Sequence, residues 1–92
     1  MIPINAENLA RAGFVQVSID DWDCEDRFGV EEVWELRRPT SRTTVELCSL
    51  WINPKLSYSA NIWTGLLNSS TGHIEDLDQL LTIVEKLEEI NV

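Results

Sequence analysis

The sequence predicts an α+β domain in which a short N-terminal helix and a C-terminal amphipathic helix flank an antiparallel meander of three to four strands (α-β-β-β-β-α). Three observations lead to this prediction. Runs of β-branched and aromatic residues fill the middle of the chain. The connections between these runs are short, which favours neighbouring antiparallel strands. Leucines recur at helical spacing near the C-terminus. Ninety-two residues fit one domain, 1–92.

The first helix is predicted at residues 6–12. Asn5 precedes it as a capping residue, and Gly13 follows it at the position where glycine commonly ends a helix. A strand is then expected at 14–19, because "FVQVSI" is β-branched and alternating.

Three further strands are expected at residues 30–38, 43–52 and 58–64. They are separated by the acidic stretch 20–29, the turn 39–41 and the connection 53–57, where Pro54 excludes a continuous strand. Residues 65–73 are rich in Gly, Asn, Ser and Thr, and we expect a loop there.

The last helix is predicted at residues 75–90. Its apolar residues recur on one face, and these are Leu77, Leu80, Leu81, Val84 and Leu87. The opposite face is almost entirely acidic. We expect both helices to cover one face of the sheet.

The strand at 43–52 is apolar on both sides. Val45, Leu47 and Trp51 point one way, whereas Cys48, Leu50 and Ile52 point the other. A sheet with one solvated face should alternate more cleanly. Either the helices divide between the two faces, or a partner or a second copy of the chain buries the second face.

The charge of the chain is strongly negative. Sixteen acids against seven bases give a net charge of −9, while four tryptophans and many branched aliphatic residues argue for a folded core. A surface of this sign repels nucleic acid and anionic membranes. We therefore expect neither to bind directly, and we expect a basic protein partner, such as a nucleic-acid-binding effector.

The cysteine pattern and the N-terminus predict a cytoplasmic protein, located in the host cytoplasm if a phage encodes it. Cys24 and Cys48 form no CxxC motif, and no basic segment followed by an apolar run succeeds Met1.

No reaction centre or cofactor is expected. Asp21, Asp23, Glu25 and Glu32 match positions 1, 3, 5 and 12 of a calcium loop, but Asp26 stands where the loop requires glycine. Strands, and not helices, are predicted on both sides of this stretch. The chain has one histidine and no nucleophile motif. We therefore predict no catalytic residue, no metal site and no enzymatic activity.

The carboxylates are concentrated in two segments. Residues 20–35 carry eight acids and one arginine, and the last helix from Glu75 to Glu89 carries six acids and one lysine. Like charges gathered in this way repel one another, so a partner of opposite sign would relieve the repulsion. The predicted partner-binding residues are Asp20, Asp21, Trp22, Asp23, Glu25, Asp26, Glu31, Glu32, Glu35, Glu85, Glu88 and Glu89.

Trp22 has two interpretations. Its ring either anchors a partner, as tryptophans often do at interfaces, or folds back over the edge of the sheet. The carboxylates could imitate a phosphate path, because alternate strand residues lie about 6.6–6.8 Å apart on one side.

Two segments resemble the ends of small uncharacterised bacterial and phage proteins. They are "ENLARAGF" and "HIEDLDQLLTIVEKL", residues 7–14 and 73–87. In those proteins a short helix, a tryptophan-containing β-meander and a final helix make the whole chain. By class, the size, acidity and architecture are also similar to phage anti-defence inhibitors, including anti-CRISPR and anti-restriction proteins, several of which are acidic mimics. This likeness rests on no motif, so it assigns no binding residues.

The function predicted from the sequence is that of a small acidic protein-interaction module. It would inhibit or sequester a basic, nucleic-acid-handling protein in phage–host conflict, acting as a nucleic-acid mimic. The alternative is an immunity-type or housekeeping binding module that forms a homodimer through the second sheet face, with an acidity that serves solubility alone.

Overall fold

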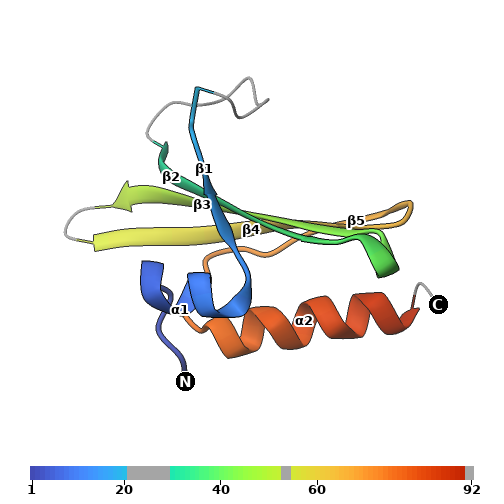
Figure 1. The fold of residues 1–92 in the computed structure, drawn as a ribbon. Helices are drawn as coiled ribbons and strands as arrows, with labels where there is room; N and C mark the ends of the chain where they lie inside the picture. Colours follow the sequence, from blue (N-terminus) through green and yellow to red (C-terminus); the bar gives the residue numbers. More distant parts are fainter. Residues whose placement is uncertain (21–29, 53–54, 91–92) are drawn as a thin grey trace.

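The computed structural model describes residues 1–20, 30–52 and 55–90, and for residues 50–52 and 55–56 it describes the backbone alone. The elements, shown in Figure 1, are α1 (Ala6–Ala12), β1 (Val15–Val17), β2 (Val30–Arg38), a 3-10 helix (Pro39–Ser41), β3 (Thr43–Ile52), β4 (Lys55–Thr64), β5 (Leu67–Ser70) and α2 (Leu77–Ile90). The predicted α+β class, with helices at both ends of an antiparallel meander, is confirmed.

The five strands form one antiparallel sheet in the order β1-β2-β3-β4-β5. The central strands β3 and β4 pair along their whole length, from Thr43 opposite Thr64 to Ile52 opposite Lys55. Both helices lie on the same side of the sheet (Figure 1). The helices therefore do not divide between the two faces, and within the described residues one face has a helical cover.

The core lies between this covered face and the helices. Alternate residues of β2, β3 and β4 point toward the helices because successive strand side chains alternate between the two faces. The buried cluster consists of Leu9, Phe14, Trp34, Leu36, Val45, Leu47, Ala60, Ile62, Ile74, Leu77, Leu80 and Val84. The α2 residues of this cluster belong to the stripe predicted from leucine spacing.

The short helix α1 has the two predicted ends. The Asn5 side chain accepts a hydrogen bond from the backbone N–H of Asn8 at 2.8 Å, and Gly13 ends the helix at a φ of 100°. A side chain at Gly13 would be strained at this φ, and its Cβ would approach Leu36 to 3.3 Å.

The sheet contains a fifth strand within residues 65–73, which were predicted as a loop. A two-residue turn, Gly65–Leu66, joins β4 to β5, and Gly65 has a φ of 61°. Glycine at the first central position is the requirement of a type II′ hairpin turn, whose twist matches the flanking strands. The turn sets the register, so β5 pairs with β4 despite its small polar residues.

Three other boundaries differ from the prediction. β1 has three residues, so it is shorter than 14–19, and β4 begins at Lys55 instead of residue 58. α2 begins at Leu77 instead of residue 75, because Asp76 caps it by accepting a hydrogen bond from the backbone N–H of Asp78 at 3.0 Å.

The Asp76 carboxylate also binds the N-terminal segment. It accepts a hydrogen bond from the backbone N–H of Ile2 at 3.0 Å, and the N–H of Leu77 donates to the Ile2 carbonyl at 2.8 Å. The bond from Ile2 is the main reason that the pKa of Asp76 lies below its ordinary value.

The face of the sheet without a helix, here called the open face, is mixed in character. Val33 is buried there, whereas Cys48 and Trp63 are half-buried. In its middle Glu35 lies directly opposite Glu46, and the two carboxylates raise the pKa of Arg37, first through its hydrogen bond with Glu35. The apolar second face inferred from strand 43–52 is therefore interrupted by charge.

The first testable prediction concerns the α2 stripe. Leu80→Ala should lower the free energy of unfolding by about 2–5 kcal/mol, because Leu80 is fully buried and its loss leaves a cavity. Urea denaturation measures this loss. The exposed Thr82→Ala is the control and should change stability by about 0.5 kcal/mol or less. A similarly small loss for Leu80→Ala would contradict the core assignment.

Candidate protein-binding surfaces

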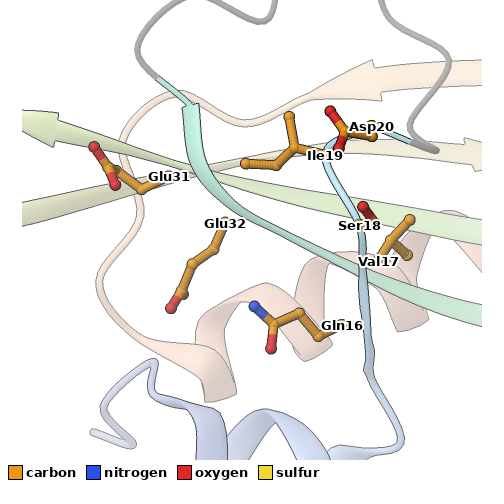
Figure 2. Close-up of a pocket in the computed structure, with 7 residues that line it drawn as sticks. All are labelled: Gln16, Val17, Ser18, Ile19, Asp20, Glu31 and Glu32. Carbon is orange, nitrogen blue, oxygen red and sulfur yellow. The ribbon is translucent and has the colours of Figure 1, made fainter.

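An open groove lies where β1 separates from β2. β1 pairs only with Val33–Glu35, so the first residues of β2 have no β1 neighbour. The groove has a volume of about 640 Å³ and is lined by Gln16, Val17, Ser18, Ile19, Asp20, Glu31 and Glu32 (Figure 2). It sits next to the acidic segment that the sequence identified.

A β-bulge shapes one wall of this groove. Val30 lies opposite Leu50, but Glu32 lies opposite Ser49, so β2 contains one extra residue at Glu31. A bulge bends its strand and changes the direction of nearby side chains. Figure 2 shows Glu31 and Glu32 leaving β2 in different directions, while Ile19 points across the gap toward β2.

Glu32 is held in place by neutral donors. Its Oε2 accepts hydrogen bonds from Trp34 Nε1 and from the Tyr58 hydroxyl, both at 3.3 Å. Burial raises the pKa of Tyr58 above its ordinary value, and the charge of Glu32 and the hydrogen bond to it raise it further. Tyr58 therefore stays a donor, and Glu32 is a positioned carboxylate whose charge neither donor neutralises.

Asp20 and Glu31 are exposed at the two sides of the groove. Neither forms an ion pair or side-chain hydrogen bond with any residue that the structure describes. Among the described residues, the lining contains three carboxylates and no lysine or arginine, and Asp20 and Glu31 have no partner there. Such a groove attracts a cationic group.

A second acidic surface runs along the exposed face of α2. Asp78, Glu85 and Glu89 are exposed, and their spacing of seven and four residues places them in one row on the helix. They lie about 10 Å and 6 Å apart along the axis at 1.5 Å per residue. We call these three residues the α2 row. Within the described part of the chain they have no ion-pair partner.

The groove and the α2 row lie on different elements. The groove is formed where β1 meets β2, whereas the α2 row lies on the exposed side of α2. Figure 2 shows Gln16 and Glu32 pointing to the side of the sheet that carries the helices. That residues 20–35 and the last helix form one contact surface stays a prediction.

Besides Glu32, two of the predicted contact residues form internal bonds. Glu88 Oε1 accepts a hydrogen bond from Arg38 Nη1 at 2.7 Å, and Oε2 accepts one from Thr43 Oγ1 at 3.3 Å and another from the Ser41 hydroxyl. Glu35 pairs with Arg37. Glu88 joins α2 to the β2–β3 connection. The local sequence contains no pattern that predicts this tertiary contact.

Five predicted contact residues lie outside the described residues: Asp21, Trp22, Asp23, Glu25 and Asp26. Both interpretations of Trp22 therefore stay predictions. The side chain of Trp51 is likewise outside the described part, whereas Trp34 belongs to the core and Trp63 to the open face.

One polar chain was not foreseen. The Ser57 hydroxyl bonds to His73 Nδ1, and His73 Nε2 bonds to Glu75 Oε1 at 2.9 Å. These are the residue types of a nucleophilic triad, but in a triad the serine contacts Nε2 and the acid contacts Nδ1. His73 and Glu75 are also about half exposed. We interpret the chain as a link between β4 and the segment before α2.

Comparison with protein-family models, curated proteins and solved structures gives no match. Neither described helix is long and apolar enough to cross a membrane. Across residues 1–20, 30–52 and 55–90, no group of three or more His, Cys, Asp or Glu side chains is arranged to hold a metal ion.

The second testable prediction concerns Glu88. Burial raises its pKa, but the hydrogen bonds from Ser41 and Arg38 outweigh burial, so the pKa lies below the ordinary value of 4.5. A lowered carboxyl pKa stabilises the fold above the unfolded-state pKa, and this contribution is lost as the pH falls through the folded-state pKa. Glu88→Gln should therefore cost about 1–3 kcal/mol at pH 7 and flatten the loss of stability below about pH 5.

Urea denaturation at a series of pH values tests this. Glu85→Gln, one turn earlier and exposed, removes the same charge from α2 and should leave the acid limb of the curve unchanged. Parallel curves for wild type and Glu88→Gln would show that the Glu88 contacts do not stabilise the fold.

Proposed function

We propose that this protein is a small acidic interaction module that binds a basic segment of another protein in the β1–β2 groove. The groove accepts lysine or arginine side chains between Asp20 and Glu31, with Glu32 as a fixed acceptor at its base. Binding of this kind needs no catalytic group, and its specificity comes from the spacing of the carboxylates.

The observation that carries the proposal is the lining of the groove. The described lining residues include three carboxylates and no basic side chain, and Trp34 and Tyr58 orient Glu32 before any partner arrives. Orientation in advance reduces the entropy lost on binding, because the acceptor is already immobilised. The free charge of Asp20 and Glu31 attracts a cationic partner and speeds its approach.

The more specific form of the proposal is inhibition. The partner would have a basic site that normally holds nucleic acid. The groove and the acids of the adjoining segment would bind to that site and block it. The phage–host setting and the anti-CRISPR class belong to this form, and the resemblance of the chain ends to bacterial and phage proteins supports it. The α2 row then serves solubility or a separate contact.

The alternative proposal is an immunity-type or housekeeping module in which the acidity serves solubility. Glu35 and Glu88 bond to arginines of the same chain, which favours this alternative because these two acids stabilise the fold. The free carboxylates around the groove favour the binding module, because solubility does not require them to share one concave site.

The third testable prediction compares two variants of equal charge. Asp20→Asn with Glu31→Gln removes two charges from the groove, and Glu85→Gln with Glu89→Gln removes two from the α2 row. An arginine-rich peptide, followed by fluorescence anisotropy, should bind the groove variant about tenfold or more weakly, while the α2 variant stays within about twofold of wild type. Salt should weaken binding, because exposed charges are screened over about 10 Å at 0.1 M.

A basic protein captured from lysate by the wild type should also bind the groove variant more weakly than it binds the α2 variant. Both variants change exposed residues, so their melting temperatures provide the check on folding. Equal losses in the two variants would show that net charge alone attracts the peptide, and the groove would then not be a binding site.

A further inference from the structure

The sheet changes character from one edge to the other. Residues 56–72 contain no charged side chain, although a quarter of the whole chain is charged. This segment holds most of β4 and all of β5. The acidic groove lies at the β1 edge, so the β5 edge is the electrically neutral end of a protein with net charge −9.

Within the described part of the chain, β5 is an edge strand without the usual protection against pairing. Charged side chains, proline, bulges or a covering element normally block such edges. Leu67–Ser70 has no charge and no proline, and its register with β4 is continuous. Leu66 is fully exposed beside it, and Leu67 is 42% exposed.

The pairing with β4 determines which β5 residues direct their backbone N–H and C=O groups toward β4 and which direct them outward. The N–H of Thr71 donates to the Ala60 carbonyl at 2.9 Å, so Thr71 faces β4 with its backbone groups. Antiparallel ladders alternate, and therefore Ser69 and Leu67 also face β4. The backbone N–H and C=O groups of Asn68 and Ser70 point out of the sheet.

The geometry points to a homodimer in which β5 pairs antiparallel with β5 of a second copy. A two-fold axis through Ser69 places Asn68 opposite Ser70 of the second copy, and the reverse. Each of these two pairs exchanges two backbone hydrogen bonds. The two Ser69 residues meet at the axis as a closely spaced pair, with Cα atoms about 4.5 Å apart, which small side chains permit.

Other surfaces are poorer places for a second copy. Stacking two open faces would bring Glu35 and Glu46 of each copy against the same carboxylates of the other copy. Pairing through β1 would form a shorter ladder, because β1 has three residues and β5 has four. β5 is the longer of the two edge strands, and pairing through it brings no carboxylates of the described residues into contact.

The strength of this dimer is limited by its small size. Stable interfaces bury about 1,200–2,000 Å² in total, more than four strand residues and two leucines supply. The dimer is therefore weak and concentration-dependent. The remaining charge of the two copies repels, so added salt should strengthen it. This is opposite to the salt effect expected for a basic partner in the groove, so the two proposals can fail independently.

Sedimentation velocity from about 10 µM to about 1 mM tests the dimer, since this range covers weak affinities. Ser70→Pro removes the outward N–H and should weaken dimerisation about tenfold or more, because proline is tolerated where an edge N–H faces solvent. Ser70→Ala is the matched control. Both variants lose the hydroxyl bond to Asn61, but alanine keeps the N–H and should dimerise like the wild type.

Amide hydrogen exchange of the wild type gives a second reading that needs no variant. The N–H groups of Asn68 and Ser70 should gain protection as concentration rises, whereas those of Leu67 and Ser69 are protected throughout. A monomer at every concentration would overturn the proposal. The β5 edge would then either pair with a strand of a different protein or face solvent. A dimer that survives Ser70→Pro but is lost in Trp63→Ala would overturn it too, by placing the contact on the open face.

Discussion

The rest of the structure depends on one constraint: both helices that the structure describes cover the same face of the sheet. α2 has 14 residues and α1 has seven, and both pack on the same face. Their buried stripe fixes which strand residues form the core, and therefore which residues face solvent. The open face must then be stable in water. Glu35, Arg37 and Glu46 make one half of it charged, while residues 56–72 on the β4–β5 half carry no charge.

The surplus of carboxylates divides between the fold and the surface. Asp76 caps α2 and holds the N-terminal segment, Glu88 joins α2 to the β2–β3 connection, and Glu32 fixes the ends of Trp34 and Tyr58. These acids are part of the structure. Those left without partners among the described residues gather at the groove and along α2. Their grouping is the reason that solubility alone is an incomplete explanation of the acidity.

The sequence predicted the features that depend on local pattern. Leucine spacing identified α2, Asn5 and Gly13 marked the ends of α1, and short connections indicated a meander. β5 was missed because Asn and Ser have low strand propensity, and its pairing is set by the turn at Gly65. The groove depends on a bulge, and the role of Glu88 on contacts about fifty residues away, so neither has a local signal.

The two edges of the sheet have opposite chemistry, and this makes the two proposed contacts compatible. The acidic groove at the β1 edge suits a cationic partner, whereas the neutral β5 edge suits backbone pairing with a second copy. Because these edges lie at opposite ends of the strand order, neither occupant covers the site of the other. A dimer joined through β5 would form one continuous sheet with an identical groove at each outer end. A partner with two basic segments could then engage both grooves, and a weak contact at each would become a stronger bivalent one if its linker spans the sheet.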